Sequence, residues 1–490
     1  MNYGLLFRTV KHLKPTQVFY QVKYRLKKSS YEQLEAPLGG STIQDSRFKT
    51  DPIPKYKCVE GEKFAFLNLE HEFAGWNFTE NGMLWAYNQN YFDWINQEEY
   101  LKEDGCKWID KFIEELPSNI IGLDPYPIAL RSINWIKFFC QYPECATKAR
   151  LDSLYSQIRL LEKKLEYHLL GNHLLEDAYA LYIGGTFFQD DKILKKAERL
   201  LLCQLKEQVL PDGAHYEQSP MYHCILLDRL FDCINIRRTD ALVGYAQLML
   251  GHLESVIWAD GSIPMLNDSA KGIAPTPNQI FDYARRLGIV WSAVTMKESG
   301  YWKFQNEHLE AIVDVGNVTA TYQPGHTHAD TFSYELRIDG KPFIVDTGIS
   351  TYNKTERRQY ERSTEAHNAV SIDGRNSSEV WGGFRVGKRA SVTLMNNKSA
   401  AIEANHNGFD KNCRRRFEIN DGAFIVEDWY DGDAVSYIHL AEDVDEKRVK
   451  VEGALSVETK PWKYSTEYNR FIEGRVIEIS FIGHCKYTIQ

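Results

Sequence analysis

Two hydrophobic patterns divide this chain of 490 residues, and one replaces the other near residue 300. From about residue 60 to 290, apolar residues recur at i, i+3, i+4 and i+7, the spacing of one helix face. This spacing predicts helices over residues 91–116, 131–142, 151–170, 192–210, 224–236 and 240–259. No repeat of fixed period is present, so a bundle, a solenoid and a closed ring of helical hairpins all stay open.

After residue 300, polar and apolar residues alternate, and Val, Ile, Thr and Phe become frequent. The alternation predicts strands in segments 310–323, 331–348, 366–374, 390–397, 400–408, 413–430 and 475–483. Because D-G and N-G turns join several of them, we expect an antiparallel sheet domain of the sandwich type. A cleft between a helical and a sheet domain would suit a large ligand.

The pattern therefore predicts three parts: a basic N-terminal segment (1–60), a helical domain (61–300) and a sheet domain (301–490). The first 28 residues hold seven Lys or Arg and no acidic residue. Their apolar residues recur at roughly helical spacing: Leu5, Leu6, Val10, Leu13, Val18 and Val22. Docking helices with a solvated basic face are the favoured interpretation, and an amphipathic helix lying on anionic lipid or a basic-surface partner is the alternative.

Composition narrows the function. A net charge of −9 and a pI near 5.9 argue against general nucleic-acid binding. The nine cysteines are odd in number, scattered and without a C-x-x-C pair, which disfavours a disulfide framework and predicts free thiols in a reducing compartment. No membrane-spanning run and no secretory signal are visible, so we expect a cytoplasmic protein, with a periplasmic or exported location as the alternative. The aromatic content of 13% fits either sugar binding or aromatic cores.

Four polar segments interrupt the helical half. In "GNHLLEDAYAL" (171–181), Asn172, His173 and Glu176 open an otherwise apolar helix, with Asn172 placed to cap it. In "LPDGAHYEQSPMYH" (210–223), a turn precedes a crowd of titratable and ring-bearing side chains that includes Glu217, Gln218 and Tyr222. Such crowding before an apolar helix is typical of a cleft lining. The other two segments are "WADGSIPMLNDSA" (258–270) and "PYPIALRSINWIKF" (125–138), the latter carrying Arg131.

The sheet half carries a different set. "GHTHADTFSYEL" holds His326 and His328, which would face the same side of a strand. With Asp346 on the next predicted strand they could bind zinc or a similar ion. "ERRQYERSTEAHNAV" then adds an arginine cluster that includes Arg362, suited to an anionic substrate, and His367.

Together these motifs resemble the heparinase II/III-like polysaccharide lyases from about residue 60 to 480. The match lies in "NHLLEDA", "DGAHYEQSPMYH", "GHTHADTFSYEL", "VDTG" and "RSTEAHNAV", in that order. One departure is "DTGI" where the family usually has "DPGT". The resemblance implies an incomplete α/α toroid followed by an antiparallel β-sandwich.

The resemblance also implies roles. Asn172 corresponds to the amide that neutralises a uronate carboxylate, and Tyr222 and His326 to the catalytic tyrosine and histidine. His328, Asp346 and His367 correspond to the family's metal-holding trio, whose divalent ion is zinc in some members and mainly structural. The remaining candidates would bind substrate: His173, Glu176, Gln218, Arg131 and Arg362.

The implied reaction is β-elimination. A lyase removes the barely acidic C5 proton of a uronic acid, so a donor must stabilise the developing aci-carboxylate. A tyrosine whose pKa is lowered by nearby positive charge, and a histidine, would serve as base and acid. The substrate would be an anionic uronate-containing polysaccharide. A non-catalytic glycan-binding or assembly protein is the alternative, and a glycoside hydrolase would need two cleft carboxylates, for which Glu176 and Glu217 are candidates.

Overall fold

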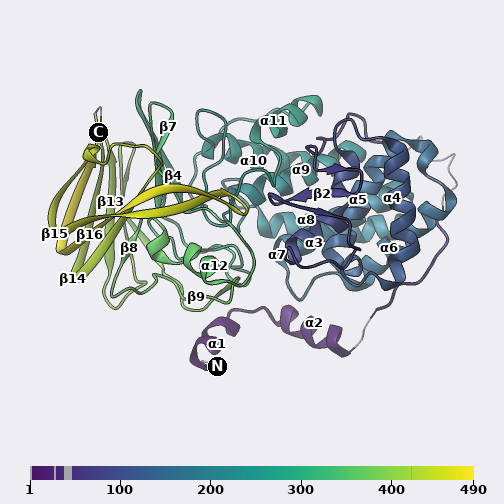
Figure 1. The fold of residues 1–490 in the computed structure, drawn as a ribbon, viewed down its shortest axis with the longest axis horizontal. Coiled ribbons are helices and arrows are strands. Elements are labelled where there is room, and N and C mark those ends of the chain that lie inside the picture. The colour runs from purple at the N-terminus through teal and green to yellow at the C-terminus, as the bar shows by residue number, and fades with distance from the viewer. Residues whose placement is uncertain (1–2, 27–28, 38–46, 421) are drawn as a thin grey trace.

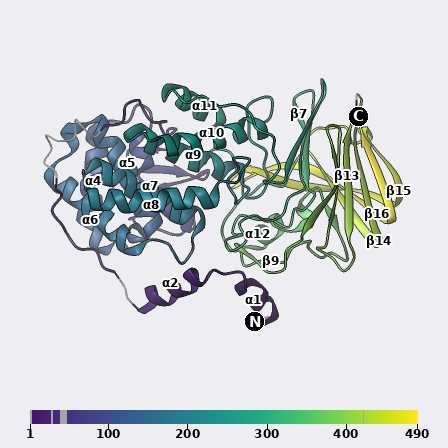
Figure 2. The ribbon, with the colours of Figure 1, turned by 180° about the vertical axis from the view of Figure 1, so that it is seen from behind.

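The computed structural model describes residues 3–26, 29–37, 47–420 and 422–490. Helices fill one end of an elongated molecule and a large curled sheet fills the other (Figure 1). Seen from behind in Figure 2, the first two helices lie along one side and reach from the helical end to the sheet end. None of the helices in the described ranges is long and apolar enough to cross a membrane.

The helices of the helical domain pack on their sequence neighbours and on next-but-one helices around one apolar core. Its helices are α3 (Met83–Tyr91), α4 (Lys102–Glu115), α5 (Pro125–Gln141), α6 (Lys148–Lys164), α7 (Gly171–Phe187), α8 (Asp191–Gln208), α9 (Pro220–Ile236), α10 (Asp240–Val256) and α11 (Pro277–Arg286). Helices α5, α7 and α9 are buried on nearly every face. This burial explains why apolar residues occur on all of their faces and not on one stripe.

Two predictions for this domain need correction. The single helix predicted over residues 91–116 is broken, because Phe92 adopts a left-handed backbone (φ 57°) and a short 3-10 turn (Asp93–Asn96) follows before α4. The start of the domain is also not helical. It forms a small antiparallel sheet of β1 (Val59–Glu60), β2 (Lys63–Phe66) and β3 (Leu69–Glu72).

The sheet domain is one continuous antiparallel sheet of 11 strands among the described residues, curled around its own apolar core. Its first strands are β4 (Tyr301–Gln305), β5 (Leu309–Asp314), β6 (Tyr334–Ile338), β7 (Lys341–Ile344) and β8 (Val370–Ser371). Its later strands are β11 (Val392–Lys398), β12 (Ala401–His406), β13 (Cys413–Ile419), β14 (Phe424–Leu440), β15 (Val449–Glu467) and β16 (Arg470–Ile489). A separate hairpin of β9 (Val380–Trp381) and β10 (Arg385–Val386), and the short helix α12 (Glu356–Glu361), lie beside it.

Hydrogen bonds from the connecting segment lock the two domains together. The buried carboxylate of Asp212, between α8 and α9, accepts from the backbone N–H groups of Lys297 (3.0 Å) and Ser299 (2.9 Å). Gln218 donates its side-chain amide to the Ser299 carbonyl at 2.7 Å, and its own carbonyl accepts from Tyr301 at the start of β4. The loop before α9 therefore lies directly against the entry to the sheet domain.

The N-terminal helices α1 (Tyr3–Val10) and α2 (Pro15–Leu26) touch both domains. Arg8 of α1 forms a two-pronged ion pair with Glu379 beside the β9–β10 hairpin, at 2.6 and 2.7 Å. Gln17 of α2 is buried and donates to the backbone of Leu169 and Tyr322. We call residues 3–26 the N-terminal arm.

Candidate active site

Asn172 lies in the first turn of α7, directly after a sharp backbone bend. Leu170 and Gly171 both have left-handed φ angles, 62° and 63°. Residue 171 must be glycine, because a Cβ there would lie 2.6 Å from Oε1 of Glu217. The helix begins at Gly171, so the prediction that Asn172 caps it is wrong. Instead the Asn172 N–H donates to Glu217 Oε1 at 2.9 Å, which places a carboxylate at the helix N-terminus.

The Asn172 side chain points at the sheet domain. Its Nδ2 donates to Glu217 Oε2 at 2.7 Å and lies 3.2 Å from Nε2 of His326. An amide nitrogen carries two hydrogens, so one can go to each partner. Since Glu217 holds both the backbone and the side chain of Asn172, it fixes which way the amide faces.

His326 and His328 lie in the loop between β5 and β6, and the prediction that they share a strand face is wrong. Pro324 and Gly325 immediately before them favour a turn over an extended strand. The two rings nevertheless reach the same buried carboxylate. His326 Nδ1 lies 2.9 Å from Asp268 Oδ2, and His328 Nε2 lies 2.8 Å from Asp268 Oδ1.

Asp268 is the charged centre of the site. Arg358 of α12 binds both of its oxygens, at 2.5 and 2.7 Å. Burial alone would raise the pKa of Asp268, but Arg358 and the two imidazoles outweigh burial and hold that pKa well below its usual range. An ionised Asp268 accepts the Nδ1–H of His326, which leaves Nε2 of His326 with a lone pair facing Asn172.

Tyr222, in the first turn of α9, stacks on His326 with ring centroids 3.9 Å apart. Its hydroxyl lies 3.2 Å from that of Tyr352. Burial, the largest effect, raises the pKa of Tyr222, and the lowering predicted from nearby positive charge does not occur. The reason is that Asp268 offsets the charge of Arg358, so Tyr222 keeps its proton at neutral pH.

The structure thus brings Asn172 and Tyr222 of the helical domain against His326 of the sheet domain. The cluster is nearly closed: Asn172 is 2% exposed and His326 8% exposed. The ring of Phe384, between β9 and β10, lies 6.4 Å from that of His326 and is itself partly exposed.

Three residues predicted to bind substrate are buried in structural roles. Arg131 is fully buried in α5, where its guanidinium donates to Gln157 Oε1, the Asn90 carbonyl and the Gly122 carbonyl at 2.6–2.9 Å. The predicted role in substrate binding is not supported, because the hydrogen-bond partners of Arg131 lie inside the helical domain. Burial lowers the pKa of Arg131 to about 9.

Gln218 and Arg362 also differ from prediction. Both ends of the Gln218 amide are occupied, by the Ser299 carbonyl and by the Thr319 N–H. Arg362 is fully buried and donates to the Thr327 carbonyl at 2.8 Å, so it supports the loop between His326 and His328. Neither side chain is available to a polysaccharide.

His173 and Glu176 follow Asn172 on α7. His173 is partly exposed, and its Nδ1 lies 3.0 Å from the Glu166 carboxylate, so a substrate role for His173 stays a prediction. Glu176 is fully buried, and its nearest cation is Arg229 at 4.0 Å. Burial raises the pKa of Glu176 to about 7. Glu176 has no exposed surface in this structure, and a contact of its carboxylate with substrate stays a prediction.

The predicted metal trio is only partly assembled. His367 Nδ1 lies 2.7 Å from Asp346 Oδ2, and the rings of His367 and His328 are 5.2 Å apart. His328 Nδ1 and His367 Nε2 have no hydrogen-bond partner in the described structure, so two imidazole donors of the right type are present. However, no three His, Cys, Asp or Glu side chains of the described residues are grouped as ligands of one ion. The divalent ion stays a prediction.

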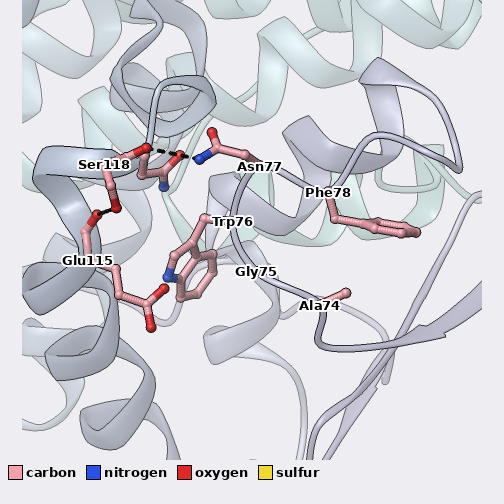
Figure 3. Close-up of a pocket in the computed structure, with 8 residues that line it drawn as sticks. Ala74, Gly75, Trp76, Asn77, Phe78, Glu115 and Ser118 are labelled. Atoms are coloured by element: carbon pink, nitrogen blue, oxygen red, sulfur yellow. Dashed lines mark hydrogen bonds between the residues drawn. The ribbon is translucent and has the colours of Figure 1, made fainter.

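A cavity of about 330 Å³ lies elsewhere in the helical domain (Figure 3). Its lining includes Trp76, Asn77, Glu115 and Asn119, and none of the three candidate catalytic residues. Trp76 is 2% exposed, so its face is not free to stack on a sugar.

The sequence reasoning missed Asp268, Arg358 as its partner, and Glu217 as the residue that orients Asn172. Asp268 lies in the polar segment 258–270 that the sequence analysis noted without choosing a residue. Three residues then converge on it from segments far apart in the chain: His326, His328 and Arg358. Only the fold shows that convergence.

Two family models match consecutive parts of the chain. Heparinase II/III N-terminus matches residues 144–284, which include Asn172 and Tyr222. Heparinase II/III-like, C-terminal matches residues 289–472, which include His326. The chain belongs to the heparinase II/III-like family.

Relatives and solved structures agree with this assignment. The chain is 22% identical over 336 residues to a heparin-sulfate lyase of Bacteroides thetaiotaomicron. The aligned region covers 56% of this chain and 46% of that protein. The chain is also 25% identical over 330 residues to a heparin-sulfate lyase of Pedobacter heparinus, 60% of this chain and 48% of that protein. The chain thus spans about half the length of the curated relatives it matches.

A crystal structure of heparinase III superposes with a TM-score of 0.67 at 14% identity, covering 100% of this chain and 92% of that one. Heparan sulfate lyase HepC from Pedobacter heparinus gives 0.55 at 16% identity, covering 96% and 87%. At these identities the likeness shows the fold alone. The predicted fold class of the heparinase II/III-like family, a helical toroid followed by an antiparallel sheet domain, is confirmed.

Proposed function

We propose that this protein is a polysaccharide lyase that cleaves a uronate-containing polysaccharide by β-elimination. The observation that carries the proposal is the contact of an amide, an imidazole and a phenol across the domain boundary: Asn172, His326 and Tyr222. Relatives named as heparin-sulfate lyases support the reaction class.

Asn172 would neutralise the substrate carboxylate. The C5 proton becomes removable only if negative charge moving onto that carboxylate is stabilised by donors already in place. Glu217 holds the Asn172 amide with Nδ2 beside the His326 ring. A uronate carboxylate entering there would accept the Nδ2 hydrogen that now points at Nε2 of His326, and this exchange would free Nε2 to act as the base on C5.

His326 is the better base and Tyr222 the better acid. Asp268 binds Nδ1 of His326, so Nε2 carries the lone pair that can accept the C5 proton. Because the pKa of Tyr222 is raised, its hydroxyl keeps the proton that the leaving O4 needs.

The elimination then proceeds by these bond changes. The C5–H bond breaks, its electron pair forms the C4=C5 double bond, and the C4–O4 bond breaks as O4 takes the proton of Tyr222. The products are a 4,5-unsaturated uronate and a new chain end, and exchange with water returns the two side chains to their starting state. If an ion is bound, His328 and His367 would hold it, and it would stiffen the loop behind His326.

The charge distribution favours a substrate of low charge density. Of the arginine cluster, Arg358 and Arg362 are fully buried, and Arg357 is paired with Glu361 at 2.8 Å. The net charge is −9, and the first 28 residues carry +7, so the rest of the chain carries −16. Such a body repels densely sulfated polymers. We therefore propose an unsulfated or sparsely sulfated uronate polymer.

The structure does not favour a glycoside hydrolase. That reaction needs two carboxyl groups facing the substrate. Glu176 is fully buried, and both oxygens of Glu217 are bound to Asn172. A non-catalytic glycan-binding protein is the remaining alternative, and the experiment below separates it from a lyase.

The test is the ultraviolet absorbance of a 4,5-unsaturated uronate, measured with unsulfated heparan, heparan sulfate, hyaluronan, alginate and capsular polymers. We expect absorbance to rise with at least one low-sulfate polymer, and Tyr222→Phe to lower kcat/KM by about 10²–10⁴-fold because it removes the acid. Tyr216→Phe is the matched control, since the Tyr216 hydroxyl is bonded to Tyr322 at 2.9 Å and lies outside the cluster. Polymer binding without any absorbance change would favour the glycan-binding alternative.

A further inference from the structure

The N-terminal arm docks on the protein with its polar side chains. Arg8 pairs with Glu379, Lys14 pairs with Glu207, and Thr9 accepts from the Trp381 indole at 3.0 Å. Gln17 is 2% exposed. The prediction of docking helices with a solvated basic face therefore holds only in part, because Arg8 and Lys14 take part in the docking contact.

Two groups of apolar side chains on the arm face solvent, whereas Tyr20 and Tyr24 pack against the helical domain. Tyr3, Phe7 and Val10 are exposed at the spacing i, i+4 and i+7, so they form one stripe on α1. A second stripe on α2 consists of Val18, Phe19, Val22 and Leu26. The described residues include 21 large apolar side chains that are strongly exposed, and seven of them lie in the 24 residues of the arm. We call them the arm stripe.

Cations border the arm stripe. Lys11, Lys23 and Arg25 are exposed, and none of them makes an ion pair with another described residue. The sequence continues with Lys27 and Lys28. The surface is therefore apolar and cationic at once, on a chain whose remainder carries −16.

We propose that the N-terminal arm binds the surface of an anionic lipid bilayer. A bilayer presents anionic headgroups directly above apolar chains, so it can pair with the cations and bury the arm stripe in the same contact. Aromatic side chains such as Phe7 and Phe19 suit this boundary because they bury large area. The proposal does not depend on the lyase activity.

The arm also contacts the hairpin beside the candidate site. Thr9 and Arg8 bind Trp381 and Glu379, and the same hairpin carries Phe384 next to His326. Figure 1 shows α1 next to β9 and α2 next to the helical domain, along the same side of the molecule. Bilayer binding through the arm would hold this side of the site close to the membrane.

The first experiment measures co-sedimentation of the full chain with vesicles of phosphatidylcholine and phosphatidylglycerol. The triple variant Phe7→Ser/Phe19→Ser/Leu26→Ser should bind at least tenfold more weakly, because it removes the apolar contact. Its matched control replaces three exposed apolar residues outside the arm: Ile120→Ser/Leu455→Ser/Phe471→Ser. The control should bind like the wild type.

The second variant removes charge and leaves the arm stripe intact. Lys11→Gln/Lys23→Gln/Arg25→Gln should weaken binding by about 100-fold, since each cation near an anionic surface contributes about fivefold. Pure phosphatidylcholine vesicles and high salt should weaken wild-type binding in the same way.

Two results would overturn the proposal. One is a wild type that does not bind anionic vesicles, or binds them no better than both arm variants. The other is a dimer in analytical ultracentrifugation that the Phe7/Phe19/Leu26 variant abolishes, with no vesicle binding, because a second copy of this chain would then cover the arm stripe.

Discussion

The two sides of the candidate site are built differently. On the helical side, Asn172 and Tyr222 lie in the first turns of α7 and α9, so helix geometry sets their positions. On the sheet side, His326 lies in a loop and is held by hydrogen bonds to Asp268, which Arg358 holds in turn. A site residue on a helix needs little outside support, whereas one on a loop depends on a buried charge network.

This difference indicates which substitutions should lower activity although the substituted residue does not contact the substrate. The sheet side should be sensitive to Asp268, which acts through other side chains, His326 first among them, and is therefore a positioning residue. The helical side should be sensitive to Glu217, which orients Asn172. Three substitutions sharpen this comparison.

The largest effect is expected for Asp268→Asn, with a fall of about 100-fold in kcat/KM, because an amide no longer favours the Nδ1–H form of His326. The variant also leaves the buried Arg358 unpaired, which should lower the free energy of unfolding by about 3–5 kcal/mol. Histidine-selective ¹⁵N NMR should show the His326 proton leaving Nδ1.

The double variant Asp268→Asn/Arg358→Met separates the two effects. It removes both charges, so stability should largely return while activity stays low. Recovery of activity together with stability would show that Asp268 is only structural. A wild-type spectrum with the His326 proton on Nε2 would contradict its role as well.

A second prediction concerns Glu176, four residues beyond Asn172 on α7. Burial raises its pKa from 4.5 to about 7, so the folded protein holds a proton that the unfolded chain releases. The stability from this proton is fully present below pH 4.5 and is lost as the pH rises through about 7. Glu176→Gln mimics the protonated form and should raise the free energy of unfolding at pH 8.5 by about 2–3 kcal/mol.

Urea denaturation at pH 8.5 and pH 4.5 checks this prediction, and the gain should vanish at the lower pH. Glu254→Gln, at an exposed position of α10, is the matched control and should show no such pH dependence. A gain of equal size at both pH values would show that packing, and not titration, is responsible.

The smallest effect is expected for Glu217→Gln. The amide has one acceptor oxygen where the carboxylate has two, so Asn172 loses one of its two bonds to residue 217. We expect kcat/KM to fall about tenfold, with KM rising less than kcat falls, because the lost orientation matters most in the transition state. An unchanged kcat would mean that Asn172 does not need Glu217.

The sequence predicted the parts of the molecule that follow local rules. Helical and alternating periods placed the two domains, and the motifs around Asn172, Tyr222 and His326 identified residues that meet in the fold. β15 was not predicted, although Val449, Val451, Leu455 and Val457 alternate there with polar residues; most of its side chains are exposed along one long hairpin with β16.

The remaining errors concern burial and long-range partners. Arg131 and Arg362 have the residue type that binds anions, but their guanidinium groups satisfy backbone carbonyls inside the protein. The raised pKa of Tyr222 depends on burial and on Asp268 46 positions away, neither of which a local pattern contains. The arm forms the predicted docking helices, but the sequence did not indicate the ion pairs of Arg8 and Lys14, because their partners Glu379 and Glu207 are distant in sequence.

In the proposed lyase, groups from both domains surround a single uronate. A crystal structure of the Tyr222→Phe variant with an uncleaved uronate oligosaccharide is the decisive measurement. We expect one carboxylate within hydrogen-bond distance of Asn172 Nδ2, with C5 of the same sugar facing Nε2 of His326. An oligosaccharide bound away from both residues, for example in the cavity beside Trp76, would contradict it.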